Sequence, residues 1–354
     1  MRTLLMEHTP EGAELALLED RTLRDYRLVP GESIRAEAVF LGRVRQNVRG
    51  MGAAFVSLPD QQVGFLPEAE AKQPLHPGDF VLVQVRKPPV GTKGAYLTKD
   101  ISLAGRGLIL LPLNGRRAVS SRVEEPGERE TLFRRAGELA PGGMGLIMRR
   151  SSLTMTDDEL RAELGILMAR WQEILAAADQ QELRLLWPGR SALEQALEDF
   201  DRVDRLILDR PDTDAPPHEL RPHPFTNFAV REQLERLCRR QVWLPSGGFV
   251  VVDPCEALTA IDVNTGKSVG KGGDREQLFL KTNLEAAEMI ARLLRVRGIG
   301  GIVIVDLIDM EEESSRQAVL DRFTALLRDD PVKCVVHGFT SLGLLELTRK
   351  KMGR

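Results

Sequence analysis

Two aspartates stand in segments that are otherwise strongly apolar. Asp262 lies within the run Leu258–Asn264, and Asp306 follows the run Gly300–Val305. Val, Ile and Leu around each acid predict interior strands. A carboxylate buried there loses its hydration at a large cost in free energy, unless a cation compensates for that cost. If the two strands are neighbours, their acids form a pair suited to Mg²⁺, which binds one or two carboxylates together with water and substrate phosphate. The pattern therefore indicates metal-assisted phosphodiester chemistry.

A neutral amide accompanies the first aspartate. Residues two apart share one face of a strand, so Asn264 is expected to point the same way as Asp262. An amide in that place can orient a second carboxylate or a bound water without adding repulsion. Asp309 lies three residues beyond Asp306, past the expected strand end, and is a weaker candidate. Either aspartate alone would indicate a strand-end acid facing water, but together with Asn264 they favour a catalytic site with Asp262 and Asp306 as metal ligands.

A helix is predicted between these two strands, over residues 274–297. Its apolar positions step by four and three, and Gly298 follows as a helix-ending residue. These apolar positions are Leu280, Leu284, Ala287, Ala291 and Leu294. Strand, helix and returning strand form a βαβ unit with the acids at strand ends, where α/β folds place their sites.

The loop before this helix resembles the end of a phosphate-binding P-loop. Gly266, Lys267 and Ser268 supply the final residues of that motif, but the motif needs another Gly five residues earlier. Ile261 occupies that position, so the match fails. Residues 270–273 are then expected to form a loop near the site that could touch a polynucleotide backbone.

Residues 35–104 predict a small β module. Five short strand-like runs, split by Gly, Pro and Asp, match a Greek-key barrel of the OB type. These runs cover 36–44, 52–58, 64–67, 80–85 and 95–98. Such barrels bind single-stranded nucleic acid by stacking bases on aromatic rings over a basic groove, which makes Phe55, Phe65 and Lys93 the candidates. The alternative, that both phenylalanines belong to the core, is equally consistent with the sequence.

Adjacent arginines end a strand in the segment 105–184. The strand 145–148 is followed by Arg149 and Arg150, whose planar guanidinium groups suit phosphate recognition. An exposed surface pair is the commoner explanation for adjacent arginines. The remaining elements expected from here to residue 243 are helices over 157–177, 193–200 and 230–240, a strand over 205–208 and a Pro-rich connection that follows it.

The size and composition are those of a globular protein with more than one core. The chain has 354 residues, 42% hydrophobic and 29% charged, and its net charge of −3 neither announces nor excludes nucleic-acid binding. No apolar run reaches about twenty residues, so no membrane span is expected, and the N-terminus turns polar too soon for a secretory signal. Cys238, Cys255 and Cys334 lie far apart, which does not support a zinc motif and favours a reducing cytoplasm.

Several long motifs resemble the catalytic core of the ribonuclease E/G family, and some are closer to the ribonuclease G branch. They are Ala260–Gly266, Thr282–Ala287, Gly300–Met310 and Leu342–Lys350. Further matching runs extend the similarity over nearly the whole chain: Leu244–Gly248, Ala53–Val56, Gly64–Pro67 and Gly91–Gly94.

The resemblance implies an α/β (α+β multidomain) fold. In the family a ribonuclease H-like domain, matching residues 1–34 and 185–243, is interrupted by an OB-fold RNA-binding domain and a 5′-sensor. These two insertions match residues 35–104 and 105–184. A DNase I-like catalytic domain follows and matches residues 244–354.

The resemblance also implies an activity. The family consists of Mg²⁺-dependent endoribonucleases that cut single-stranded, A/U-rich RNA to 5′-phosphate and 3′-hydroxyl ends in rRNA maturation and mRNA decay. Asp262 and Asp306 match the aspartates that hold Mg²⁺, and Asn264 matches an asparagine that supports the second aspartate. The family's RNA-contacting positions in the barrel match Phe55, Phe65 and Lys93.

Two departures from the family pattern stand out. The family's 5′-monophosphate sensor is an Arg followed by a Thr, and the matching pair here is Arg149-Arg150. Arg149 and Arg122 would keep the role, whereas a long cation in place of a small hydroxyl would alter or abolish the sensing geometry. Family enzymes also continue into a cysteine pair that shares zinc between subunits and into a small dimerising domain. The sequence given ends at Arg354, so zinc is not expected and self-association would lack those elements.

Two other functions stay open. An RNA-binding protein of the same family, with weak or no nuclease activity, would keep the barrel, although the intact acid pair argues against it. A small-molecule enzyme that binds phosphate is disfavoured by the failed P-loop match and by the barrel.

Overall fold

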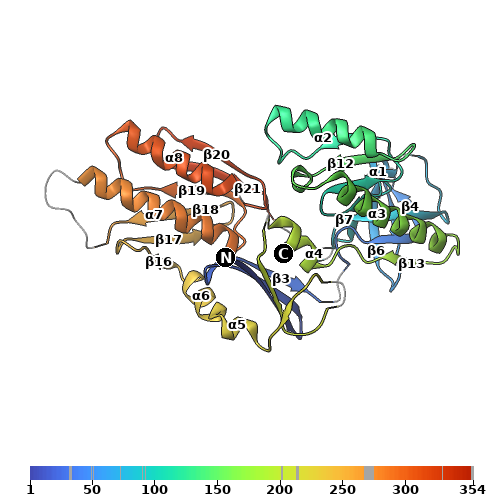
Figure 1. Cartoon of the computed structure of the whole chain (residues 1–354), viewed down its shortest axis with the longest axis horizontal. Coiled ribbons are helices and arrows are strands. Elements are labelled where there is room, and N and C mark those ends of the chain that lie inside the picture. The colour runs from blue at the N-terminus through green and yellow to red at the C-terminus, as the bar shows by residue number, and fades with distance from the viewer. Residues whose placement is uncertain are drawn as a thin grey trace. The chain divides into compact units, whose positions relative to one another are not determined.

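The computed structural model describes residues 1–351 apart from 32, 33, 49, 51, 72, 90, 92, 201, 213, 214, 267–274 and 329. The chain divides into two compact units (Figure 1). The first combines residues 1–31 with the segment from 202 onward, and the second comprises residues 32–201. The first unit is therefore assembled from both ends of the described chain, and each unit is considered separately below.

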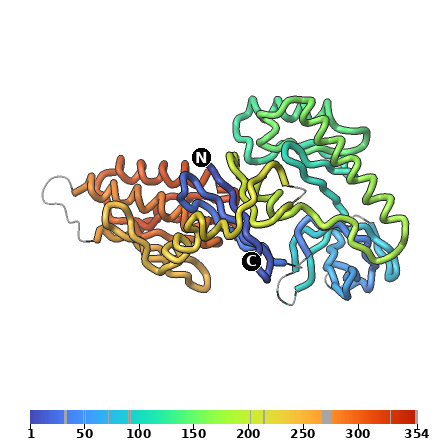
Figure 2. The backbone as a smooth tube through the Cα atoms, turned by 60° about the horizontal axis from the view of Figure 1, so that its bottom comes forward, coloured from blue at the N-terminus to red at the C-terminus, as the bar shows by residue number. Residues whose placement is uncertain are grey.

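A five-stranded sheet opens the first unit. Its order is β15-β14-β1-β2-β3, with β2 antiparallel to its neighbours β1 and β3, and β14 and β15 parallel to β1. The strands are β1 (Arg2–Thr9), β2 (Gly12–Glu19), β3 (Thr22–Pro30), β14 (Arg205–Leu208) and β15 (Glu219–Leu220). Segments about two hundred residues apart in sequence thus lie side by side in one sheet (Figure 2). Two short helices follow, α5 (Pro224–Asn227) and α6 (Val230–Leu237).

A six-stranded sheet in the same unit carries the predicted catalytic residues. Its order is β16-β17-β18-β19-β21-β20. The strands are β16 (Gln241–Trp243), β17 (Phe249–Pro254), β18 (Leu258–Asn264), β19 (Gly301–Asp306), β20 (Cys334–Phe339) and β21 (Leu345–Arg349). Helices α7 (Arg275–Val296) and α8 (Glu313–Arg328) cover one face of this sheet (Figure 1). Inward residues such as Ile261 and Val305 join one core with both helices and with Leu5 of β1, which leaves the opposite face open.

The second unit contains a closed five-stranded barrel. The order β4-β5-β6-β8-β7 is completed by pairing of β7 with β4, and β13 (Arg184–Trp187) adds to β4 from outside. The barrel strands are β4 (Val39–Val48), β5 (Ala53–Ser57), β6 (Val63–Pro67), β7 (Phe80–Lys87) and β8 (Ala95–Thr98), with helix α1 (Glu68–Ala71) between β6 and β7. The expected barrel is therefore confirmed and is consistent with an OB-like domain.

A small α/β layer completes the second unit. Its sheet has the order β11-β12-β10-β9. The elements are β9 (Leu103–Ala104), β10 (Leu108–Leu111), β11 (Arg117–Val119), β12 (Gly145–Met148), the one-turn η2 (Arg150–Leu153) and helices α2 (Pro126–Leu139), α3 (Asp157–Ala178) and α4 (Ala192–Asp199). Thr156 and Glu159 form a reciprocal capping box that starts α3, while Leu160, Leu167 and Trp171 bury its apolar stripe.

The structure differs from the sequence-based predictions in a few elements whose formation or position depends on tertiary contacts. The Pro-rich connection contains β15 and α5, because β15 gains hydrogen bonds from β14. Residues 185–200, which the family resemblance grouped with 1–34, pack in the unit of the barrel because β13 pairs with β4. Helix α6 ends at Leu237, short of residue 240. Within the described residues, no helix combines the length and apolar character needed to cross a membrane.

Candidate active site

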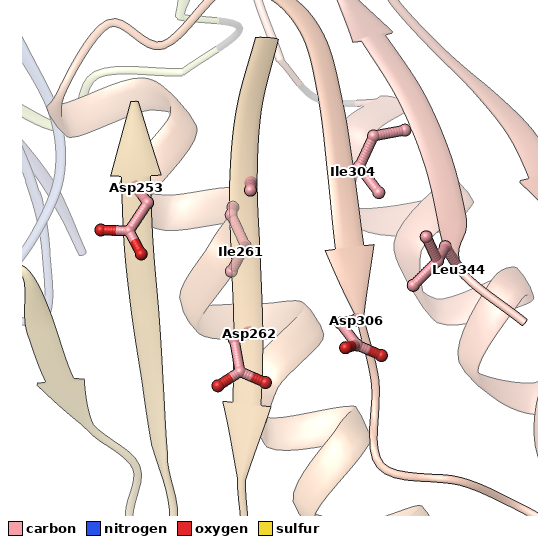
Figure 3. A pocket seen from close by; sticks show the side chains of 7 residues that line it. Asp253, Ile261, Asp262, Ile304, Asp306 and Leu344 are labelled. Carbon is pink, nitrogen blue, oxygen red and sulfur yellow. The ribbon is translucent and has the colours of Figure 1, made fainter. Parts of the chain in front are cut away.

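Strand register brings the two predicted catalytic aspartates together. β18 and β19 are parallel, and Asp262 lies directly opposite Asp306. Both side chains are exposed on the open face of the sheet, at the carboxyl ends of their strands. Figure 3 shows them side by side on these neighbouring strands. The alternation of inward Ile261, Val263 and Val305 with the outward acids explains why two carboxylates fit within apolar strands.

Asn264 is the immediate partner of Asp262. It lies two residues further along β18 and donates a hydrogen bond from Nδ2 to Oδ2 of Asp262 at 2.7 Å. The resemblance implied that this asparagine supports the second aspartate. In the structure its hydrogen bond goes to Asp262, the aspartate on its own strand face. The amide therefore fixes the orientation of one carboxylate of the pair.

A buried side chain of α7 fixes the backbone that follows Asp306. Asn283 donates from Nδ2 to the carbonyl of Ile308 at 2.8 Å and accepts from the backbone N–H of Ile308 at 3.0 Å. Both hydrogen bonds run through a fully buried amide, which holds the chain as it leaves β19. Sequence reasoning did not single out Asn283, because the contact joins residues that the helix period alone does not relate.

A shallow cavity of about 250 Å³ lies over these strands and is lined by Asp253, Ala260, Ile261, Asp262, Ile304, Asp306 and Leu344. Asp253 of β17 is the third carboxylate there (Figure 3). Arg240 donates to both of its oxygens, at 2.5 and 2.7 Å, and these hydrogen bonds hold the pKa of Asp253 below its ordinary value. Asp253 is thus already paired, which separates it chemically from the other two acids.

The remaining pair suits a weakly held divalent cation. Within the described residues, no cationic side chain forms a salt bridge with Asp262 or Asp306, and no cluster has three or more His, Cys, Asp or Glu side chains placed to hold a metal. Two carboxylates without a third ligand fit Mg²⁺, which retains several waters and binds substrate phosphate. They fit zinc poorly, since a protein zinc site has three or four protein ligands, most of them His nitrogen or Cys sulfur. Asp309 lies exposed beyond the end of β19, and the predicted loop 270–273 lies outside the described residues.

The barrel presents an aromatic row on its outer surface. Phe55 of β5 lies opposite Phe65 of β6, with ring centroids 6.0 Å apart, and Phe65 lies 6.1 Å from Tyr96 of β8. The ammonium of Lys87 stands 5.7 Å from the Tyr96 ring. All three rings are half-buried and none belongs to the barrel core, so the alternative of core phenylalanines is wrong. Lys93 is exposed just before β8.

Tyr96 and Lys87 extend this row beyond the residues predicted from sequence. Tyr96 pairs with Phe65 across two parallel strands, and Lys87 pairs with Tyr96 across β7 and β8. The alternation of its strand could have predicted that Tyr96 points outward. Its neighbours Phe65 and Lys87 follow only from the strand pairing in the closed barrel. An aromatic row beside a cation is what stacking of unpaired bases requires.

Two of the three predicted phosphate-sensing arginines form ion pairs with acids of α4. Arg149 forms a salt bridge with Glu198, and the guanidinium of Arg190 binds the same carboxylate. Arg122 lies 3.8 Å from an oxygen of Asp199. Arg150 starts η2 and is exposed. Glu198, Asp199 and Arg190 were missed by sequence reasoning, although the acidic end of the predicted helix 193–200 was a usable signal.

Comparison with known proteins identifies relatives of this chain. A model of the ribonuclease E/G family matches residues 102–352. Ribonuclease G of Escherichia coli K12 is 33% identical over 98% of this chain and 79% of its own length. Ribonuclease E of Haemophilus influenzae is 32% identical over 99% of this chain, which spans only 42% of that relative. From the family match and these relatives, the chain belongs to the ribonuclease E/G family.

Proposed function

We propose that this protein is an endoribonuclease that hydrolyses single-stranded, A/U-rich RNA to 5′-phosphate and 3′-hydroxyl ends. The observation that carries the proposal is the register pair Asp262–Asp306 on an exposed sheet face, with neither acid neutralised by a cationic residue in the described chain. Relatives named ribonuclease G and ribonuclease E support the reaction class.

Asp262 and Asp306 would hold one Mg²⁺ ion between the carboxyl ends of β18 and β19. When bound, the ion would stabilise negative charge on the scissile phosphate and favour deprotonation of the attacking water. The chain's own residues supply the geometry. Asn264 restrains the carboxylate of Asp262, and Asn283 restrains the backbone after Asp306, so both side chains leave the sheet on the same face before substrate arrives.

The barrel would hold the unpaired bases. Phe55 and Phe65, extended by Tyr96, offer π-faces on which bases of any sequence can stack, and Lys87 and Lys93 add positive charge for the backbone. The net charge of −3 does not oppose RNA binding, because basic residues are needed only where the RNA backbone lies on the surface.

The 5′-end response would differ from that of the family. A terminal phosphate reaching Arg149 and Arg122 would meet guanidinium groups already paired with Glu198 and Asp199. Displacing two carboxylates offsets the gain from binding the phosphate. Cleavage would therefore depend little on the 5′-phosphate.

The architecture proposed for these elements follows the family. The sheet β15-β14-β1-β2-β3 would be the ribonuclease H-like domain, residues 105–184 the sensor, and the sheet with α7 and α8 the DNase I-like catalytic domain. We assign the activity to rRNA processing and mRNA decay in the cytoplasm.

The test is turnover of a short 5′-monophosphorylated, A/U-rich oligonucleotide by the purified protein with and without Mg²⁺. Asp262→Asn should lower kcat by about a hundredfold or more while retaining RNA binding, since its carboxylate stabilises charge that develops in the transition state. Unchanged cleavage by Asp262→Asn would refute the assignment. Binding without cleavage by the wild type would favour an RNA-binding protein lacking nuclease activity.

A further inference from the structure

An aromatic pair lies on the open face of the six-stranded sheet, with Trp243 exposed and Phe249 partly buried. Trp243, the last residue of β16, is 63% exposed, whereas Trp171 and Trp187 are 3% and 8% exposed. The Trp243 ring packs edge-on against Phe249 of β17, with centroids 5.3 Å apart and an interplanar angle of 65°. An exposed ring held by a second ring offers a π-face on which a base can stack.

The local fold holds this pair in place. Val242 turns inward and is buried, so the strand alternation forces Trp243 outward. The tight turn after β16 is closed by hydrogen bonds from Leu244 N to Gly248 O at 2.8 Å and from Gly247 N to Leu244 O at 3.0 Å. The two rings therefore stand on a rigid hairpin.

Strand register connects the pair to the acids. Trp243 lies opposite Phe249, and Phe249 lies opposite Asn264. Asn264 in turn donates to Asp262, which faces Asp306. With strands about 5 Å apart, the tryptophan backbone lies about 10 Å to the side of β18, within reach of a nucleotide near a phosphate bound at the acids.

We propose that Trp243 and Phe249 form a stacking site for one unpaired RNA base close to the scissile phosphate. The proposal rests on the proposed endoribonuclease function and assigns a contact that fixes where the strand lies across the acids. A stacked base has a π-face whatever its identity, so the site selects for unpaired RNA over duplex and not for sequence. It is separate from the aromatic row of the barrel, which belongs to the other unit.

An abasic scan tests the proposal. A single abasic nucleotide is moved through an A/U-rich oligonucleotide, and kcat/KM is measured for the wild type, Trp243→Ala and Trp243→Phe. In the wild type, one abasic position near the cut should lower kcat/KM about tenfold, as expected for the loss of one stacked base. Trp243→Ala should lower kcat/KM of the intact oligonucleotide by a similar factor and abolish the penalty at that position. Trp243→Phe should largely restore both.

Val335→Ala is the matched control, because Val335 is a 39% exposed apolar residue on the opposite edge strand β20. It should leave kcat/KM unchanged. Additive effects of Trp243→Ala and the abasic position would overturn the proposal, as would a change of oligomeric state in Trp243→Ala without a change in kcat/KM. Quenching of tryptophan fluorescence by the oligonucleotide without Mg²⁺, present in the wild type and lost in Trp243→Phe, reports stacking even if no cleavage is found. Failure of the nuclease assignment and failure of the stacking site are therefore distinguishable.

Discussion

Asn264 gives the two proposed catalytic aspartates unequal roles. Its amide restrains Asp262 directly, at 2.7 Å, whereas Asp306 is positioned through the backbone that Asn283 holds behind it. A restrained carboxylate and one free to adjust its rotamer suit a cation that must also accept water and substrate phosphate. Asp262 would then be preorganised for the cation, whereas Asp306 could adjust to it.

The ion pairs of Glu198 lead to a prediction about the response to a 5′-phosphate. Because its carboxylate holds both Arg149 and Arg190, the wild type should cleave 5′-hydroxyl and 5′-monophosphate oligonucleotides with similar kcat/KM. Glu198→Gln removes the charge that competes with phosphate. The kcat/KM ratio favouring the 5′-monophosphate should then rise about tenfold, the equivalent of one charge-assisted contact.

Glu182→Gln is a suitable control, since Glu182 is an exposed acid in the same unit. It should leave the ratio unchanged. Two results would show that Glu198 and Asp199 do not compete with the 5′-phosphate for the arginines. One is a wild type that strongly prefers the 5′-monophosphate, and the other is a Glu198→Gln variant with the wild-type ratio.

Some of these side chains could be predicted from sequence and others could not. Asp262 and Asp306 were predictable because an acid inside an apolar strand pattern is chemically conspicuous, and the intervening helix pattern made the strands neighbours. Glu198 could not be paired with Arg149, because nearly fifty positions separate them and their contact depends on packing of α4. Trp243 carried no sequence signal of its own, since its outward direction is set by a strand of only three residues.

Packing between elements places an ion pair between β2 and α6. Glu14 of β2 is buried and accepts hydrogen bonds from Arg231 Nη1 at 2.9 Å and from Tyr26 Oη at 2.5 Å. Burial opposes ionisation of Glu14, but the hydrogen bonds from Arg231 and Tyr26 outweigh it, so its pKa lies below the ordinary value. These contacts fasten the short helix α6 to the N-terminal sheet.

The depressed pKa predicts a pH-dependent effect of Glu14→Gln. An acid whose pKa is lowered by folding contributes stability above its unfolded pKa of about 4.3, and that stability is lost as the pH falls through the folded value. At pH 7 the variant should lose about 2 kcal/mol of unfolding free energy for β1–β3, from hydrogen bonds to a charged group. Below about pH 4 the difference from wild type should shrink.

Hydrogen exchange of the β1–β3 amides under increasing urea measures this difference, with the exposed Glu11→Gln as the control for loss of charge. Equal protection in Glu14→Gln and the wild type at both pH values would show that the ion pair contributes nothing.

Local sequence patterns predicted the helices and strands better than they predicted which elements pair with one another. The barrel strands, α3 and α7 follow from alternation, helical spacing and capping residues that lie within each segment. β15 and α5 were missed because they lie among prolines, and β15 exists only through its pairing with β14. Its stability comes from a neighbour and not from its own sequence.

The complete first unit is built around one shared core. Residues of β1 to β3 pack in the same core as β16 to β21 and both long helices. Arg292 and Arg295 of α7 reinforce that link, through a hydrogen bond to the carbonyl of Leu23 at 2.5 Å and a salt bridge with Asp25 at 3.2 Å. The helix that supports the acid pair is thus fixed by the N-terminal strands. A sequence read in order cannot show this, because 170 residues of the other unit intervene.

The central claim is that Asp262 and Asp306 share one divalent cation. The most direct measurement is a titration with Mn²⁺, followed by electron paramagnetic resonance, on the wild type, Asp262→Asn, Asp306→Asn and the control Asp321→Asn, an exposed acid of α8. The structure predicts that the wild type and Asp321→Asn bind Mn²⁺ alike, whereas each of the other variants loses the same site. Undiminished Mn²⁺ binding by both Asp262→Asn and Asp306→Asn would contradict the claim.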